Sequence, residues 1–256
     1  MYLPSLRRLV AYDVAIICDD SGSMNLPADS DNPNLSRWAE LKQSVQILLR
    51  ITEAMGKTVD VYFLNRGCFY GIVSWSQIAG QFDPRPGGYT NTVAILQLVW
   101  MHRQQNQVAE RPFVLHLFTD GHPTDENGNE NMQTFARWMS TRQFMQNTFI
   151  AILLCTDDEE VDAAYRPLEY RVRGQYGWIG ATCGVPGVDV TEDYRGEKRD
   201  VLALRGQNYS FTFGDFIAKA LVGVIDPMVH IIDMPTGTSI YGSRSLGGGG
   251  GGCATQ

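Results

Sequence analysis

Residues 14–24 of the chain read VAIICDDSGSM, an apolar run that ends in two acids, two serines and a glycine. Val14–Cys18 is continuously apolar, which is the pattern of a strand buried on both faces of a parallel sheet. The polar stretch begins where that strand would end, so Asp19, Ser21 and Ser23 stand at its carboxyl end. In open α/β sheets, binding sites form outside this edge. The segment therefore predicts both a fold class and the position of a site.

Further apolar runs of the same kind follow along the chain, at Val59–Leu64, Phe113–Phe118 and Phe149–Cys155. Segments with helical periodicity separate these runs. The first of these segments carries an apolar stripe made of Trp38, Leu41, Val45, Leu48, Leu49 and Thr52. Alternation of buried strands with amphipathic helices predicts an α/β fold, a three-layer, Rossmann-like, doubly wound sheet with right-handed crossovers.

Two segments fit this alternation less well. Cys68–Ser74 follows the second strand across a turn-prone Asn-Arg-Gly sequence, which predicts an antiparallel edge strand on a mostly parallel sheet. Residues 174–210 are rich in glycine and charge, and we interpret them as a short strand at Val188–Val190 with a loop insertion. We expect one domain over residues 1–230, with a core at about 12–226, followed by a flexible glycine-rich tail at 231–256.

Composition narrows the possible functions of the 256-residue chain. Its formal net charge is −7 and it has no long basic run, which disfavours nucleic acid as a partner. No stretch approaches the ~20 apolar residues that cross a bilayer, and no signal-peptide pattern precedes the first strand. The five cysteines include no CxxC pair, and Cys18 and Cys155 fall inside apolar strands. We therefore expect free thiols and a cytoplasmic protein.

Two more polar pieces occur at the same kind of junction as the first. Thr90 lies in GYTNT, just before a predicted helix, and Asp120 lies in FTDG, directly after the strand Phe113–Phe118. Because the carboxyl ends of central strands converge on one crevice, we expect Thr90 and Asp120 to meet Asp19, Ser21 and Ser23. Hydroxyl and carboxylate oxygens suit one hard cation such as Mg²⁺, and neither His nor Cys is required, which argues against zinc and copper. Each carboxylate can act directly or through a bound water.

At these residues the chain resembles the von Willebrand factor A-type (VWA) domain family. The metal-ion-dependent adhesion site of that family is a DxSxS sequence with a distant Thr and a distant Asp, and all five positions match. The resemblance covers roughly residues 12–226. It implies a Rossmann-like fold, one Mg²⁺ or Mn²⁺ ion at Asp19, Ser21, Ser23, Thr90 and Asp120, and recognition of a protein partner that offers an Asp or Glu. The compact form is similar to the intracellular members of the family.

We also considered other roles for the chain. A scaffold that assembles through other surfaces, with the metal only bracing the loops, is the competing function, and the oligomeric state stays open. The chain carries no nucleotide-binding or nucleophile-elbow motif, and Ser21 replaces the second acid that a DxD phosphatase needs. We therefore predict no enzymatic activity and no catalytic residues.

Three polar features near the motif are interpreted as structural. We expect the Asp20 side chain to point away from the metal ligands, and His122 to be a polar loop residue. Asp125 begins a sequence that imitates a calcium loop, but Ala136 stands where the final Glu should be. An Asx-rich turn is the better interpretation of that sequence.

Overall fold

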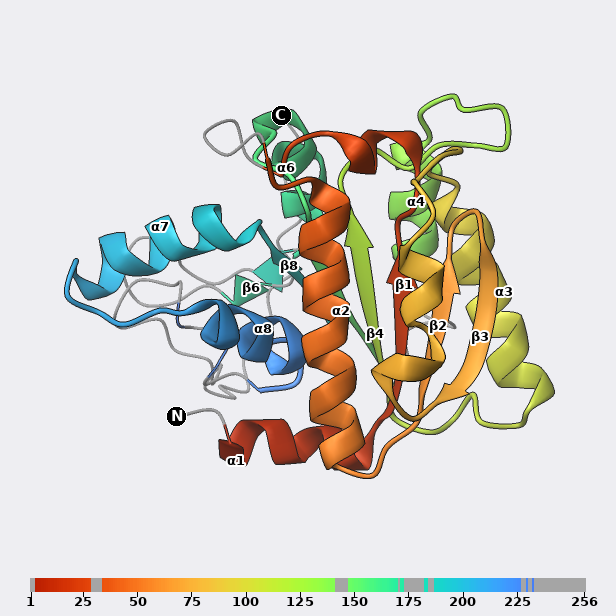
Figure 1. The fold of residues 1–256 in the computed structure, drawn as a ribbon, viewed down its shortest axis with the longest axis horizontal. Coiled ribbons are helices and arrows are strands. Elements are labelled where there is room, and N and C mark those ends of the chain that lie inside the picture. Colours follow the sequence, from red (N-terminus) through yellow and green to blue (C-terminus); the bar gives the residue numbers. More distant parts are fainter. Residues whose placement is uncertain are drawn as a thin grey trace, which may run out of the picture.

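A six-stranded sheet lies at the centre of the described part of the chain (Figure 1). The structure is a computed structural model, and it describes residues 3–28, 34–140, 147–169, 171–172, 182–183, 187–226, 229 and 232. The strand order is β3-β2-β1-β4-β5-β8. The strands are β1 (Asp13–Cys18), β2 (Val59–Phe63), β3 (Gly67–Ile72), β4 (Phe113–Thr119), β5 (Thr148–Leu154) and β8 (Val188–Thr191).

The sheet is parallel except at one edge. β1 pairs in parallel with β2 and β4, and β5 pairs in parallel with β4 and β8. Only β3, among these six strands, is antiparallel to its neighbour, β2. The predicted fold class, a mostly parallel α/β sheet with one antiparallel edge strand, is confirmed.

Helices cover both faces of the sheet, which gives three layers (Figure 1). One face packs against α1 (Leu3–Leu6), α2 (Arg37–Ala54), α7 (Tyr194–Arg205) and α8 (Phe213–Val222). The other packs against α3 (Thr92–Gln105), α4 (Met132–Met139) and α6 (Glu159–Tyr165). Each face of the sheet has its own hydrophobic core, and β1 contributes to both because its side chains alternate between the faces. Ile16 and Cys18 lie in the core under α2, and Ala15 and Ile17 lie in the core under α3. All six residues of the stripe predicted for α2 are buried.

The segment predicted as a loop insertion contains a helix. Residues 194–205 form α7, which begins because the Asp193 carboxylate accepts hydrogen bonds from the backbone N–H groups of Arg195 and Gly196. Its charged sequence hides the helical period, since Val201 is its only buried large apolar residue. β6 (Arg171–Val172) and β7 (Thr182–Cys183) form a separate antiparallel pair. The rest of the predicted insertion before Gly187, and the predicted tail apart from Ile232, lie outside the described residues.

Cys18, Cys68 and Cys155 have free thiols, as predicted for Cys18 and Cys155. Burial raises the pKa of the Cys18 and Cys155 thiols well above the ordinary value, with nearby carboxylates adding to the shift. Both side chains therefore favour the protonated thiol over the thiolate in the folded protein. Within the described residues, no helix is long and apolar enough to cross a membrane.

Candidate metal centre

The carboxyl ends of β1 and β4 lie side by side and carry the two predicted acids. The backbone N–H of Asp19 donates to the carbonyl of Phe118 at 3.0 Å, which continues the strand pairing into the loops. The Asp19 side chain is completely buried. Its Oδ1 accepts from the backbone N–H of Ser21 at 2.9 Å, and its Oδ2 accepts from Thr119 Oγ1 at 2.8 Å. Both oxygens are thus held in place before any ligand binds.

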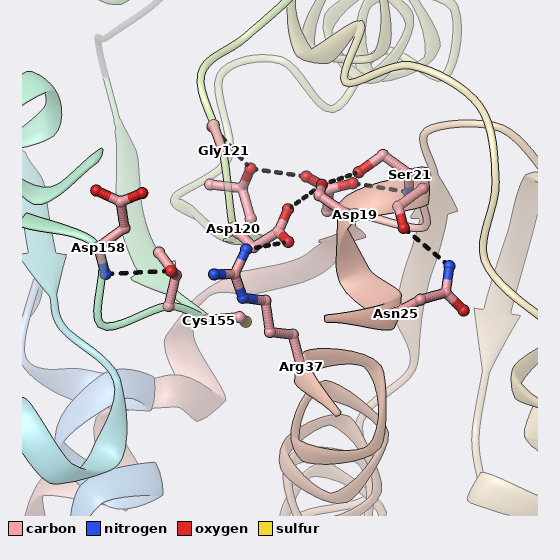
Figure 2. Close-up of polar contacts among 12 residues, drawn as sticks. Asp19, Ser21, Asn25, Arg37, Asp120, Gly121, Cys155 and Asp158 are labelled. Carbon is pink, nitrogen blue, oxygen red and sulfur yellow. Dashed lines mark hydrogen bonds and ion pairs between the residues drawn. The ribbon is translucent and has the colours of Figure 1, made fainter. Parts of the chain in front are cut away.

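Two serine hydroxyls link the DxSxS loop to Asp120 (Figure 2). Ser23 Oγ donates to Asp120 Oδ1 at 2.8 Å, and Ser21 Oγ lies 3.1 Å from Ser23 Oγ. A hydroxyl has only one proton to donate. Because Ser23 donates it to Asp120, Ser23 accepts the hydrogen bond from the Ser21 hydroxyl. Three of the five predicted ligands, Ser21, Ser23 and Asp120, therefore form one hydrogen-bonded set, and Asp19 is joined to it through the Ser21 backbone N–H.

Thr90 lies on the third loop, next to this set. The carbonyl of Gly88 accepts from the Gly22 N–H at 3.2 Å, and the Gly87 N–H donates to the Asp20 carbonyl at 2.8 Å. These bonds fix the loop against the DxSxS segment, and Thr90 itself is 6% exposed. Within the described part of the chain, Thr90 makes no hydrogen bond to the other four residues. Its backbone carbonyl instead accepts from the Thr124 N–H at 2.8 Å.

Arg37 completes the cluster, and the sequence did not identify it. Figure 2 shows its guanidinium reaching from the start of α2 to Asp120, where NH1 lies 2.9 Å from Oδ2. The Arg37 side chain is 13% exposed, the Asp120 side chain is not exposed, and the Arg37 Nε has no hydrogen-bond partner among the described residues. The loop after the motif turns back to place it, since the Arg37 N–H donates to the Leu26 carbonyl at 3.0 Å.

The position of Arg37 in α2 is unfavourable for a basic side chain. It is the first residue of α2, directly after the cap Ser36, whose side chain accepts from the Ala39 N–H. The N-terminal end of a helix carries partial positive charge and disfavours a basic side chain. A basic residue at this position therefore signals a nearby anion, which here is Asp120.

The cluster carries more negative than positive charge. Burial, followed by the negative charge of Asp120, raises the pKa of Asp19 to about 7, against the lowering effect of hydrogen bonds from Ser21 and Thr119. The cluster holds two buried carboxylates and one guanidinium, which pairs with Asp120, so its formal charge is −1 when both acids are ionised. Carboxylate and hydroxyl oxygens are the donors that Mg²⁺ and Mn²⁺ prefer. The residues present therefore fit a divalent cation.

Asp20 serves the neighbouring turn, as its predicted orientation implies. Its Oδ1 accepts from the Asn65 backbone N–H at 2.8 Å and from Asn65 Nδ2 at 3.1 Å, and its Oδ2 lies 3.0 Å from Arg66 Nε. Asn65 Nδ2 also lies 3.0 Å from the Tyr89 carbonyl, to which it donates. Asp20 thus ties the turn between β2 and β3 to the loop that carries Thr90.

The loop after Asp120 is built as an Asx turn, which confirms the interpretation of its calcium-like sequence. Asp125 Oδ1 accepts from the backbone N–H groups of Asn127 and Asn129, at 2.8 and 2.9 Å. His122 is partly buried, and its Nδ1 lies 3.4 Å from Glu130 Oε2. Neither feature contributes to the cluster around Asp120.

Comparison with known proteins shows a structural similarity at low identity. No protein-family model matches the sequence, and neither does any curated protein. The chain is similar to the crystal structure of the SpRpn10 VWA domain, with 12% identity and a TM-score of 0.46. The match covers 78% of this chain and 100% of that one.

Proposed function

We propose that this chain is a protein-recognition module that holds one divalent cation, Mg²⁺ or Mn²⁺, at the carboxyl edge of its sheet. The ligand oxygens come from Asp19, Ser21, Ser23, Thr90 and Asp120, directly or through water. The observation that carries the proposal is the pair of buried carboxylates linked through Ser21 and Ser23. Burial and the negative charge of Asp120 raise the pKa of Asp19. A divalent ion supplies positive charge to this pair.

The partner contributes an Asp or Glu to the ion. The hydroxyls of Ser21, Ser23 and Thr90 neutralise no charge, and Arg37 already takes part of the charge of Asp120. The bound ion therefore keeps positive charge on its open side and attracts a carboxylate more strongly than a neutral hydrogen bond would. Without the ion, the net charge of −7 repels an acidic partner. Binding of that partner therefore depends on the ion.

We place this recognition in the cytoplasm and without catalysis. The free thiols of Cys18, Cys68 and Cys155 support a reducing compartment. Around the cluster, the groups that bond to Asp19 and Asp120 are hydroxyls, backbone N–H groups and a guanidinium, and none of them is a general base at neutral pH.

Thermal unfolding with and without metal tests the ion. An ion that binds only the folded state stabilises it by about 2.7 kcal/mol at a hundredfold excess over its Kd, which raises Tm by roughly 5–10 °C. Asp120→Asn should abolish the rise. Asp83→Asn is the matched control, because it removes the same charge from a side chain that is 74% exposed and pairs with Lys42 on the surface. A wild-type Tm that does not change across millimolar Mg²⁺ and Mn²⁺ rejects the metal site.

The mode of recognition is tested separately with a cell extract. Partners are captured on immobilised wild type and on the Asp120→Asn variant, each in Mg²⁺ and in chelator. Recognition through the ion predicts partners that appear only with wild type in Mg²⁺, and that are lost when their own acids are changed to amides. Partners retained under all four conditions favour the scaffold function, with the metal bracing the loops.

A further inference from the structure

A polar cavity lies at the other end of the parallel strands from the candidate metal centre, at the amino edge of the sheet. It has a volume of about 370 Å³ and sits among the first residues of β1, β2 and β4, the end of α3 and the turn from α2 to β2. In Figure 1 this is the lower end of the sheet, whereas the loops that carry Asp19 and Asp120 are at the upper end. The size falls within the range of small-molecule sites.

A buried arginine forms the inner wall of this cavity. Arg103 is 5% exposed and its guanidinium lies over the ring of Phe113, 4.0 Å from the ring centre. NH2 donates to the carbonyls of Val108 and Arg111, at 2.6 and 3.0 Å, and NH1 lies 3.3 Å from Asp13 Oδ2. Its Nε is buried and has no hydrogen-bond partner among the described residues. Arg103 therefore supplies a fixed positive charge to the wall of the cavity.

Two more cations line the same cavity. Arg111 NH2 lies 2.7 Å from Asp13 Oδ1, so Asp13 is shared between two arginines. Lys57 donates to the Val10 carbonyl at 3.0 Å, and among the described residues no carboxylate lies within 4 Å of its ammonium. Burial first, and then the charge of Arg111, lower the pKa of Lys57, against the raising effect of Asp13. The cavity therefore gathers positive charge that its own acids do not fully balance.

The acids limit what else the cavity can hold. Asp13 and Asp60 also line it, so the formal charge of the lining is +1 with His102 neutral. Asp60 Oδ1 accepts from the Gly71 N–H at 2.8 Å, and its Oδ2 lies 3.8 Å from His102 Nδ1. A second anionic group beside Asp60 would be repelled. The side of the cavity near Asp60 and Asn106 suits hydroxyl groups, which can donate to a carboxylate and accept from an amide.

We propose that this cavity binds the phosphate group of a small molecule. The phosphate contacts Lys57 and Arg111, which combine a point charge with guanidinium donors, next to the fixed charge of Arg103. A phosphate fills only part of about 370 Å³, so a phosphomonoester with a hydroxyl-bearing remainder matches both the space and the acid at Asp60. The same phosphate chemistry is offered by free inorganic phosphate.

Titration calorimetry at constant ionic strength, in a buffer free of phosphate, separates these sources. The probes are inorganic phosphate, ribose 5-phosphate and ribose. Ribose 5-phosphate should bind saturably and about tenfold more tightly than phosphate, and ribose should not bind. Equal saturable affinities for the two phosphates support the phosphate site and assign it to the free ion. Absence of saturable binding by either phosphate overturns the proposal.

Charge-matched variants show whether the cavity is the site. Lys57→Gln and Arg111→Gln change partly exposed side chains, and each should weaken ribose 5-phosphate binding by tenfold or more. Lys42→Gln is the control, because it removes one positive charge on α2 from a residue that does not line the cavity. Circular dichroism confirms that the variants are folded. If Lys42→Gln weakens binding as much as Lys57→Gln does, the phosphate responds to general charge and the proposed site is wrong.

Discussion

The two ends of the parallel strands, which we call the carboxyl edge and the amino edge of the sheet, carry an excess of opposite charges. At the carboxyl edge, the buried Asp19 and Asp120 outnumber their single guanidinium, Arg37. At the amino edge, Arg103 and Arg111 share the single carboxylate of Asp13. Helices that connect parallel strands begin near the first edge and end near the second, so their dipoles present positive charge to the acids and negative charge to the arginines. The architecture therefore makes an excess of acids tolerable at one edge and an excess of bases tolerable at the other.

The largest expected effect comes from removing the buried cation of the amino edge. Arg103→Met leaves the Val108 and Arg111 carbonyls without their donor and Asp13 with one partner in place of two. Breaking such a buried pair costs about 3–5 kcal/mol, which urea unfolding should detect as a lower midpoint.

Arg111→Met is the matched control at the same edge. It breaks an ion pair to the same carboxylate, but its side chain is 63% exposed. Exposed pairs contribute about 0–1 kcal/mol. Equal losses in the two variants would show that the buried contacts of Arg103 stabilise the fold no more than an exposed ion pair does.

What the sequence could predict depends on the range of the interactions. Strand runs such as Val14–Cys18 and Phe113–Phe118 are local patterns, and parallel topology then brings Asp19 and Asp120 to one edge. The contact between Arg37 and Asp120 spans 83 positions and depends on how the loop after the motif folds back. No local period encodes it. The one local signal that could have pointed to a nearby acid is a basic residue at a helix start, where the helix dipole disfavours it.

Helix α7 shows the second limit of sequence patterns. Hydrophobic periodicity detects a helix through its apolar face, and α7 buries Gly196, the charged Glu197 and Val201. Glu197 is buried because it pairs with Lys219 of α8 at 2.9 Å. A helix that packs through an ion pair and a glycine does not show the apolar stripe, so a loop was predicted there.

Between the charged edges, the middle of the sheet should stay neutral, and pH tests this. His116 in β4 is completely buried, and burial lowers its pKa to about 4 from an ordinary value of 6.5. Its Nε2 lies 3.3 Å from the Leu221 carbonyl, so Nε2 carries the proton of the neutral ring. Because the unfolded chain binds the proton first, the stability from neutral His116 is complete above about pH 6.5 and is lost as pH falls toward 4.

Comparing wild type with His116→Gln separates the effect of His116 from that of the buried acids. A buried acid with a raised pKa, such as Asp19, makes the fold more stable as the pH falls, which is the opposite of the effect of His116. From pH 7 to pH 4.5, wild type should lose about 2 kcal/mol of stability relative to the variant. Urea unfolding of both proteins at both pH values gives the difference. A difference that does not change with pH would mean that His116 is not held neutral by the fold.

Arg37 allows the charge balance of the carboxyl edge to be changed by one unit. In Arg37→Gln, Asp120 loses its guanidinium and a divalent ion no longer competes with a fixed positive charge. We expect Mn²⁺ to bind about tenfold more tightly and the metal-free protein to melt at a lower temperature. Arg37→Lys keeps the charge and should keep the wild-type affinity for the ion. Weaker metal binding by Arg37→Gln would instead make Arg37 a positioning residue for Asp120.

The smallest expected effect concerns Thr90, the predicted ligand that stands apart from the hydrogen-bonded set. Thr90→Val keeps the shape of the side chain and removes only its hydroxyl. If that hydroxyl is a metal ligand, the loss is about 1 kcal/mol of metal binding, a factor of about five in Kd, with folding stability nearly unchanged. Thr92→Val is the matched control, since it deletes a hydroxyl that donates to the Thr90 carbonyl on the same loop. Its metal affinity should equal that of wild type. Manganese titration of the three proteins decides: equal affinity in all three removes Thr90 from the site and leaves the ion to the two loops that carry Asp19 and Asp120.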